Sequence, residues 1–341
     1  MINKTYTCDC IIAGRLERES IINEDGSISI DQPGGNLLYT AYGFTLWGKT
    51  AGLVARIGCD FPDEWIEEIG NNSINTSGLT KNPDFHDSRS YVYVDKNQNL
   101  VHENPGNYFS KNNLPLPKTL LGYKQLIPHI DNRLQRAGYS ILPEHFPQEF
   151  FDCHQLALCP VDFITHNILP AYFRAQQSGG NVFIHVGRSY CHSSFFSDFA
   201  ALVCGAVVLL ISEENARKLF LGRSDNTLLI AEAMVGFGIE NVIISIPGNG
   251  FLLLNMHNKT KILVPNYPVK CVDPSGNDDA FFGGFLAGFF NHHNLTQAAI
   301  TGSVTASVMN EGSTPNFLLG ALKDLLDARV EYLEEKVRII A

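Results

Sequence analysis

Several features that would indicate a membrane, a nucleic acid or a metal are missing from this chain of 341 residues. No apolar run reaches the roughly 20 residues of a membrane-spanning helix, and the most apolar stretch, 199–211, suits a buried core element instead. The chain begins without an apolar signal region. Lys and Arg do not cluster and the net charge is −10, so we expect no nucleic acid and no membrane as partner.

Metal-type spacing is missing too. The eight cysteines form no C-x-x-C pair, and the histidines do not place two ligands one turn apart with a third nearby. We therefore expect a reduced, zinc-free, cytoplasmic protein. No G-x-G-x-x-G follows the first predicted strand, which argues against a dinucleotide-dependent dehydrogenase. The 45% hydrophobic and 18% charged residues are typical of a globular chain with a large core.

The most informative segment that is present runs from Asp273 to Phe290. Its sequence D-P-S-G-N-D-D is a turn that ends in acidic residues and leads into an apolar, glycine-spaced helix. The first N–H groups of a helix have no internal partner, and together with the macrodipole they form an anion site. A carboxylate on that turn would accept a proton from a hydroxyl while the N–H groups hold a phosphoryl group. One Asp there is most often only a cap, but three acids and a glycine before so apolar a helix favour a small-molecule kinase.

From residue 156 onward, strands and helices alternate, which predicts a parallel sheet covered on both faces. Strands are predicted at 156–159, 182–185, 207–211 and 241–246, and helices at 165–177, 213–221, 226–237, 295–310 and 317–337. Nearer the start we predict strands at 8–14 and 50–57 and helices at 37–47 and 63–71. Ligands of such sheets bind beyond the carboxyl ends of the strands.

Two hairpins interrupt this pattern. One covers 20–30 with Asp25-Gly26 as its turn, and the other pairs 90–95 with 100–103. We expect them to form a small sheet that projects from the main domain. The proline-rich stretch that follows, about 107–150, is long for a connection. It is either a surface insertion or a part of the acceptor pocket.

Two signatures in this chain resemble those of the ribokinase/PfkB family of carbohydrate and nucleoside kinases. The segment 273–290 resembles the family's C-terminal D-T-x-G-A-G-D signature, and P-G-G-N at 33–36, leading to G-x-D at 58–60, resembles its N-terminal one. The resemblance implies an α/β, ribokinase-like fold, with a central mostly parallel sheet, helices on both faces and a small β-sheet lid. We expect a single domain over 1–341, with lid hairpins at about 15–33 and 88–106. In this family such lids often form a dimer interface, so a homodimer through the lid is an expected option.

The resemblance also implies roles for individual residues. Asp279 would be the general base that accepts the proton of the acceptor hydroxyl, and ATP, Mg²⁺ and, in some members, K⁺ would be cofactors. The expected residues are Gly276, Asn277 and Asp278 for the anion hole; Gly248, Gly250, Asn215 and Ser245 for ATP; Glu19, Gly34, Gly35, Tyr39 and Asp279 for a sugar or nucleoside; and Asp273, Ser275, Gly312 and Asn316 for a monovalent cation. Gly250 is expected to lie against ATP, and Gly34 and Gly35 to flex and approach the sugar.

Three departures from the family pattern leave an alternative open. Asp278 stands where the family normally has Gly, and a carboxylate about 5 Å from a phosphoryl oxygen would repel it by about 3 kcal/mol at an effective dielectric near 20. Alternatively, Asp278 turns outward or holds Mg²⁺, which would reverse the sign of the effect. The Mg²⁺-organising N-x-x-E segment reads S-E-E-N at 212–215, so Glu213 or Glu214 would have to substitute. Pro247 removes one N–H near the nucleotide. The leading hypothesis is an ATP-dependent kinase of a sugar, polyol or nucleoside hydroxyl; the alternative is a non-catalytic ligand-binding relative.

Overall fold

The computed structural model describes residues 7–125, 130–177 and 179–340. Its α-helices are α1 (Asn36–Thr45), α2 (Asp63–Gly70), α3 (Pro105–Lys111), α4 (Phe163–Gln176), α5 (Phe196–Val203), α6 (Glu213–Leu219), α7 (Thr227–Val235), α8 (Asn277–His292), α9 (Leu295–Asn310) and α10 (Lys323–Glu334). Its strands are β1 (Cys10–Ala13), β2 (Glu17–Ile22), β3 (Ile28–Gly34), β4 (Ala51–Gly58), β5 (Ile74–Asn82), β6 (Arg89–Val94), β7 (Leu100–Val101), β8 (Gln155–Leu158), β9 (Asn181–His185), β10 (Val208–Ser212), β11 (Asn241–Ile246), β12 (Gly250–Asn255), β13 (Lys261–Val264) and β14 (Arg338–Ile339).

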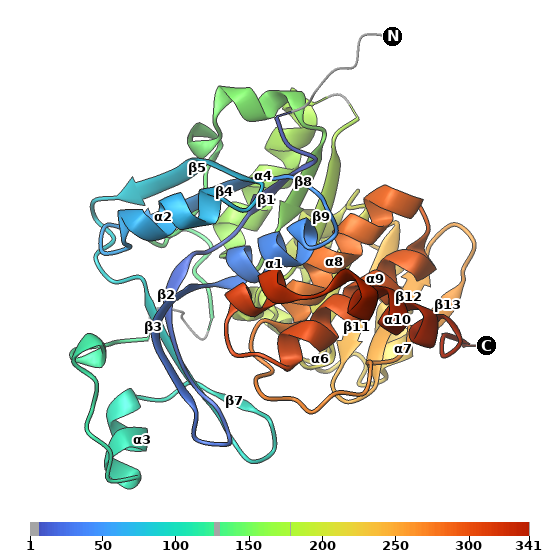
Figure 1. Ribbon diagram of the computed structural model, residues 1–341. Helices are drawn as coiled ribbons and strands as arrows, with labels where there is room; N and C mark the ends of the chain where they lie inside the picture. The colour runs from blue at the N-terminus through green and yellow to red at the C-terminus, as the bar shows by residue number, and fades with distance from the viewer. Residues whose placement is uncertain (1–6, 126–129, 178, 341) are drawn as a thin grey trace.

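Ten strands form one large sheet in the order β14-β13-β12-β11-β10-β9-β8-β1-β4-β5. The pairs from β11 through β10, β9, β8, β1 and β4 to β5 are parallel, while β12, β13 and β14 add an antiparallel edge. Helices cover both faces of this sheet (Figure 1). The predicted fold class is confirmed.

The hydrophobic core is divided in two by the alternation of side chains along the strands. On β1, Cys10 and Ile12 face the core beneath α1, α8, α9 and α10, whereas Ile11 and Ala13 face the core beneath α4, α5, α6 and α7. Successive side chains of a strand point to opposite faces. A strand buried on both faces therefore has a continuous apolar sequence, as parallel strands of this kind do.

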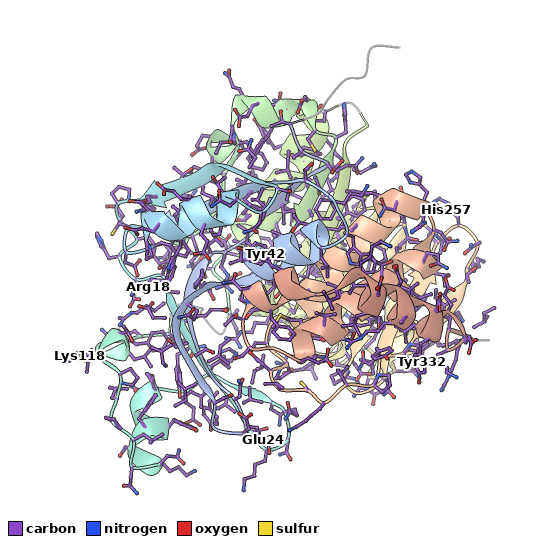
Figure 2. All side chains as sticks on the ribbon, in the orientation of Figure 1. Arg18, Glu24, Tyr42, Lys118, His257 and Tyr332 are labelled. Atoms are coloured by element: carbon purple, nitrogen blue, oxygen red, sulfur yellow. The ribbon has the colours of Figure 1, made fainter. Side chains whose placement is uncertain are left out.

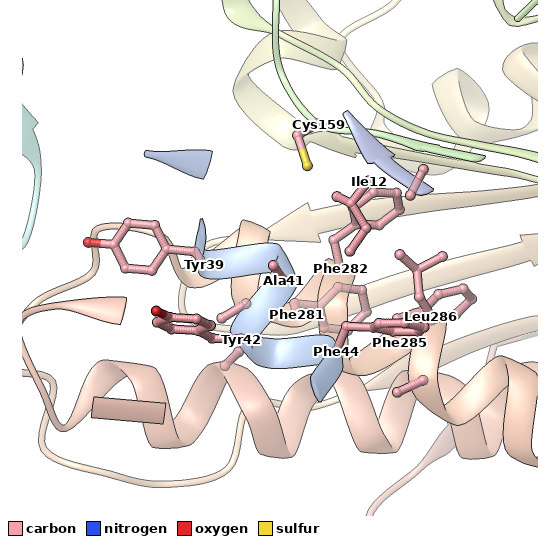
Figure 3. Close-up of a cluster of buried hydrophobic side chains, with 14 of the residues drawn as sticks. Ile12, Tyr39, Ala41, Tyr42, Phe44, Cys159, Phe281, Phe282, Phe285 and Leu286 are labelled. Atoms are coloured by element: carbon pink, nitrogen blue, oxygen red, sulfur yellow. The ribbon is translucent and has the colours of Figure 1, made fainter. Parts of the chain in front are cut away.

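Helix α8 is buried on all sides because two helices pack closely against it. A Cβ at Gly283 would lie 2.1 Å from the Thr40 carbonyl of α1, and one at Gly284 would lie 2.1 Å from Thr305 Oγ1 of α9. Figure 3 shows Phe281, Phe282 and Phe285 of α8 in the same cluster as Phe44 of α1. Phe44 also meets Phe290 edge to face, with ring centroids 5.7 Å apart. The glycine spacing of this segment thus positions the helix whose first turn carries the acidic residues.

The two predicted hairpins form a second sheet of four strands in the order β3-β2-β6-β7. It projects from the main body, with Glu24 near its tip and Arg18 near its base (Figures 1 and 2). The inner face reaches the C-terminal part of the chain, where Asn23 Nδ2 donates to Ser313 Oγ over 3.0 Å. We refer to this four-stranded sheet as the lid.

The outer face of the lid is covered by the first part of the predicted insertion. Phe109 of α3 and Leu120 are buried against Ile22 of β2 and Tyr91 of β6. Tyr108 also contacts Tyr93, with ring centroids 5.2 Å apart. The later part, from Tyr139 to Phe150, packs instead into the core beneath α4. The stretch 107–150 is therefore more than a surface insertion, because both of its parts cover apolar surface.

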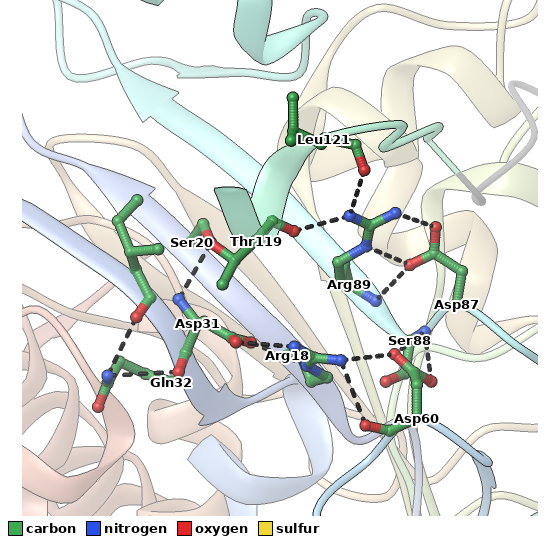
Figure 4. A network of polar contacts seen from close by, with 11 residues as sticks. Arg18, Ser20, Asp31, Gln32, Asp60, Asp87, Ser88, Arg89, Thr119 and Leu121 are labelled. Atoms are coloured by element: carbon green, nitrogen blue, oxygen red, sulfur yellow. Dashed lines mark hydrogen bonds and ion pairs between the residues drawn. The ribbon is translucent and has the colours of Figure 1, made fainter. Parts of the chain in front are cut away.

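An arginine ties the base of the lid to the main sheet (Figure 4). The Arg18 guanidinium donates two bonds to Asp31, of 2.8 and 2.7 Å, and one of 3.1 Å to Asp60. Asp60, the acidic residue of the G-x-D signature, also accepts from the Ser88 N–H. Since Ser88 directly precedes β6, the signature carboxylate fixes the start of both lid hairpins.

Several expectations about secondary structure were wrong. Strands β5, β12, β13 and β14 were not predicted. The apolar run 199–211 is divided between α5 and β10 by the turn at Gly205, where φ is +74°. The last helix is shorter than predicted, because Ala321 and Leu322 are extended and separate the short 3₁₀ helix Pro315–Gly320 from α10. Within the described residues, no helix is both long enough and apolar enough to cross a membrane.

Candidate active site

The site lies at the edge of the sheet where the parallel strands end. At this edge, the first turn of α8 meets the ends of β8, β9 and β11. Thr40 Oγ1 of α1 donates to the Asp279 carbonyl over 3.2 Å and accepts from Cys159 Sγ, just beyond β8. These bonds fix the backbone of Asp279 against the sheet.

Gly276 shapes the turn that begins α8. Its φ of 68° is left-handed, and a Cβ there would lie 2.3 Å from Cδ1 of Tyr39. Glycine is therefore required both by the backbone conformation and by the Tyr39 ring. With this turn in place, the helix begins at Asn277 and its N-terminus faces the strand ends.

The residues predicted to form the anion hole lie at the turn and the first turn of α8. As first-turn residues, Asp278 and Asp279 have N–H groups without a partner inside the helix. The Asn277 N–H, in contrast, donates to the Pro274 carbonyl over 3.3 Å. This turn bond engages Asn277, so the available donors belong to the two aspartates and, at the turn, to Gly276.

Asp279 is largely enclosed, and its nearest ionisable partner is a histidine. His185, the last residue of β9, has its Nδ1 atom 2.9 Å from Asp279 Oδ1, with side-chain exposures of 8% and 17%. The two atoms are within ion-pair distance but outside hydrogen-bond geometry. Burial raises the pKa of the Asp279 carboxyl, and His185 opposes that shift. A carboxyl with a raised pKa at a strand edge is suited to proton transfer.

The neighbouring carboxylate, Asp278, points toward β11. Its Oδ1 atom accepts a hydrogen bond of 2.7 Å from Ser245 Oγ and one of 3.2 Å from Asn277 Nδ2. Ser245, predicted to contact ATP, is thus engaged with α8. These bonds hold the Asp278 carboxylate at the side of the helix N-terminus.

On the acceptor side, Glu19 of the lid meets Tyr39 of α1. The Tyr39 hydroxyl donates to Glu19 Oε2 over 2.9 Å. A Cβ at Gly34 would lie 2.0 Å from the same oxygen. Burial and the nearby Glu17 carboxylate raise the pKa of Glu19 to about 8, so this carboxyl is largely protonated at neutral pH. The structure therefore brings three of the predicted acceptor residues together.

The P-G-G-N turn, whose glycines are expected to flex, is held in this conformation by close contacts and hydrogen bonds. Gly35 has φ of 94°, and a Cβ there would lie 2.4 Å from the Arg15 carbonyl. Asn36 accepts from the Arg15 N–H over 3.0 Å and donates to the Pro160 carbonyl over 2.6 Å. The turn thereby joins the ends of β1 and β8, and Gly34 provides space for Glu19.

A cleft with a volume of about 400 Å³ opens beyond β10 and β11, beside the predicted nucleotide residues. It is lined by His192, Glu213, Glu214, Arg217, Lys218, Leu221 and Pro247. Asn215 and Gly248 directly follow lining residues, and the side chain of Ser212 caps α6, its Oγ accepting a hydrogen bond from the Asn215 N–H.

Gly250 has a structural reason to be glycine. Its φ is +114°, and a Cβ would lie 2.1 Å from the Val264 carbonyl of β13. The backbone therefore already requires glycine there, and the expected collision with ATP is not needed to explain it.

The expected cation residues are only partly brought together. Asp273 is fully buried; its Oδ1 accepts from the Ser275 N–H over 2.7 Å, while its Oδ2 and Ser275 Oγ are buried without a hydrogen-bond partner. Burial raises the pKa of Asp273 to about 6. Gly312 is buried, whereas the Asn316 side chain is exposed.

Reasoning from the sequence missed His185. It lies far from Asp279 in the sequence and belongs to no signature. The available signal was a histidine closing the apolar strand 182–185, at the sheet edge where ligands bind.

The chain is similar to known carbohydrate and nucleoside kinases. Residues 164–317 match the model of the pfkB family carbohydrate kinase. The cytidine kinase of Thermococcus kodakarensis is 24% identical over 295 residues, covering 86% of this chain and 93% of that protein. The resemblance to the ribokinase/PfkB family is confirmed, and the comparisons support a kinase of sugars or nucleosides.

Solved structures show the same fold. An Escherichia coli protein described as a ribokinase II, in complex with ATP and Mg²⁺, has a TM-score of 0.66 at 13% identity, with coverage of 96% of this chain and 99% of that one. The Burkholderia thailandensis nucleoside kinase in complex with inosine has a TM-score of 0.65 at 15% identity, with coverage of 95% and 96%.

Proposed function

We propose that this chain, with its similarity to the ribokinase/PfkB family, transfers the γ-phosphoryl group of ATP to a hydroxyl group of a sugar, polyol or nucleoside. The observation that carries the proposal is the first turn of α8. There an enclosed carboxyl, Asp279, and unpartnered N–H groups lie near the pair formed by Glu19 of the lid and Tyr39 of α1, and near the strand end at Ser245.

In the proposed reaction, the O–H bond of the acceptor breaks as its oxygen bonds to the γ-phosphorus. The proton goes to the Asp279 carboxylate, and the electron pair of the broken P–O bond leaves with ADP. The N–H groups of Asp278 and Asp279, with the helix dipole, stabilise the charge on the phosphoryl group. Such transfer depends mainly on positioning and charge neutralisation, which an immobile helix N-terminus provides.

ATP is proposed to bind in the cleft beyond β10 and β11. Mg²⁺ would neutralise phosphate charge when bound. Glu213 is engaged by Arg217 and Thr227, while Glu214, among the residues that the structure describes, pairs with the exposed Lys218. Glu214 is therefore the carboxylate we propose to face the magnesium ion and its waters.

A monovalent cation such as K⁺ fits the turn before α8. Two buried oxygen atoms there, Asp273 Oδ2 and Ser275 Oγ, have no hydrogen-bond partner, and burying an unsatisfied oxygen is costly. Asp273 and Ser275 are proposed as ligands. Gly312, in the loop that follows α9, is proposed as a further ligand. The exposed Asn316 would have to reorient to contribute.

A homodimer through the lid is restricted in the surface that it could use. The outer lid face is already covered by Phe109 and Leu120, so a partner would have to use another lid surface, such as an edge strand.

The experiment is ADP formation, in a coupled assay, across a panel of sugars, polyols and nucleosides that includes cytidine. We expect acceptor-dependent turnover with at least one compound and its absence without Mg²⁺. No turnover with any acceptor, in a protein that binds one of them, would favour the non-catalytic alternative. No observation in the fold or the comparisons favours that alternative at present.

A further inference from the structure

The contact between Asp279 and His185 has no counterpart in the two signatures, and the proposed reaction does not yet use it. His185 closes β9 and pairs with Leu210 of β10 in the middle of the sheet. It is 6% exposed, and its ring lies 5.8 Å from that of Phe282, one turn along α8 from Asp279. The position of the imidazole is thus fixed from both the strand and the helix.

The strand alternation explains why a histidine at this position reaches the carboxylate. Phe183 and His185 lie on the same face of β9. Phe183 contacts Phe289 and Phe290, near the end of α8, with ring centroids 5.7 and 5.5 Å apart. Two residues further along the strand, His185 meets the beginning of the same helix.

We propose that His185 is a positioning residue for the general base, an inference that rests on the proposed kinase function. Its Nδ1 atom holds Oδ1 of Asp279 and keeps the carboxylate ionised, which leaves Oδ2 to accept the proton of the acceptor hydroxyl. His185 neither donates nor takes that proton; the proton stays on Asp279 until the phosphorylated product leaves.

The other ionisable groups around Asp279 do not replace His185. The Asp278 carboxylate disfavours a second negative charge, while Arg15, which is ion-paired with Glu17 at 2.8 Å, acts in the same direction as His185 but more weakly. Tyr39 faces the carboxylate from α1 and is bonded to Glu19. His185 is therefore the main group that favours the ionised base.

The test uses two substitutions that separate the N–H position from the imidazole ring. In His185→Asn, an amide N–H can occupy the place of Nδ1; His185→Ala removes the ring and the N–H position together. Activity of the base is lost as the pH falls through the pKa of Asp279, so removing the imidazole, which opposes the burial-raised pKa of Asp279, moves the acidic limb of the kcat/KM profile to higher pH. A partner that favours the ionised form typically lowers a carboxyl pKa by about 1–3 units.

We expect the acidic limb to move up by at least about one pH unit in both variants, and kcat to fall further in His185→Ala than in His185→Asn. The matched control is His166→Asn, which removes another fully buried imidazole that bonds the Cys159 carbonyl rather than Asp279. This control should lower the unfolding temperature without moving the limb. An unmoved limb in both His185 variants would overturn the proposal.

A readout that does not depend on activity is the ¹⁵N spectrum of the histidine rings, with the His185 signals assigned by their loss in His185→Asn. We expect a proton on Nδ1 of His185 in the wild-type protein near neutral pH, and a changed Nδ1 signal in Asp279→Ala. Identical His185 signals in both proteins would refute the contact. If the wild-type protein phosphorylates no acceptor, the proposed function fails, while this measurement still decides on the pairing.

Discussion

The orientation of the Asp278 carboxylate determines how strongly ATP phosphates bind at the start of α8. The hydrogen bond that Asp278 accepts from Ser245 allows this effect on ATP affinity to be tested by mutation. A carboxylate free to enter the anion hole, about 5 Å from a phosphoryl oxygen, would weaken binding by about 3 kcal/mol, or more than a hundredfold. The 2.7 Å bond from Ser245 Oγ holds it toward β11 instead. We therefore expect Asp278→Asn to change ATP affinity less than about tenfold.

The Ser245→Ala variant should produce the repulsion that Ser245 now prevents. Without the hydroxyl, Asp278 is free to turn toward the phosphates, and ATP binding should weaken by up to about a hundredfold, less so at high salt because screening reduces the charge effect. In the Asp278→Asn background the same substitution should have almost no effect on ATP affinity. The difference between the two backgrounds is the coupling energy of the pair.

Calorimetric titration of the four proteins with ATP, with and without Mg²⁺ and at two salt concentrations, measures these values. Denaturant unfolding supplies the control for stability, since loss of a hydrogen bond to a charged group costs about 1.5–3 kcal/mol. A wild-type protein that does not bind ATP, and that gains binding through Asp278→Gly, would refute the reasoning and support the non-catalytic alternative. Equal effects of Ser245→Ala in both backgrounds would show that Ser245 does not restrain Asp278.

Three further predictions concern the lid and the acceptor side. Arg18→Ala removes the bonds to Asp31 and Asp60. Amide hydrogen exchange in β2 and β6 should then become faster, and KM for the acceptor should rise. Unchanged exchange would show that Arg18 does not hold the lid to the main sheet. Glu19→Gln should raise the unfolding temperature at about pH 8.5 but change it little at about pH 5. The reason is that the wild-type fold loses stability as the pH rises from the pKa that Glu19 has in the unfolded chain to its pKa of about 8 in the fold. An effect that does not depend on pH would refute the raised pKa. Phe109→Ala should lower the free energy of unfolding by about 3–5 kcal/mol. The exposed lid face should also self-associate, which light scattering would detect. A variant that is as stable as the wild type and does not associate would show that this cover is dispensable.

The sequence allowed the main layers to be predicted because they follow from strong patterns. Continuous apolar strands such as 241–246 and the helix 295–310 were placed with the bounds that the structure has. The strand Ile74–Asn82 was missed because it lies at the sheet edge and is mostly polar, so that no alternation distinguishes it from a loop. β12 and β13 were not predicted because they form an antiparallel edge, which does not continue the alternation of strands and helices on which the prediction rested.

The site could be predicted only where its residues are close in sequence. The turn 273–279 contains the helix N-terminus and its carboxylates together, so its chemistry is visible in a single segment. The contacts Asp279–His185 and Asp278–Ser245 join the first turn of α8 to two different strands, β9 and β11, and nothing in one sequence specifies which strand ends this turn meets. The role of Gly34 was likewise assigned to substrate, whereas the structure shows that its missing side chain makes room for Glu19.

The most direct test of the central claim is turnover by Asp279→Asn with the acceptor that the panel identifies. Asparagine keeps the shape of the side chain and removes its ability to accept a proton, so we expect kcat to fall by about 10²–10⁴-fold, while the dissociation constants of ATP and acceptor change less than about threefold. Asp278→Asn serves as the matched control, with turnover within about tenfold of the wild type. Wild-type turnover in Asp279→Asn would place the general base elsewhere and contradict the account.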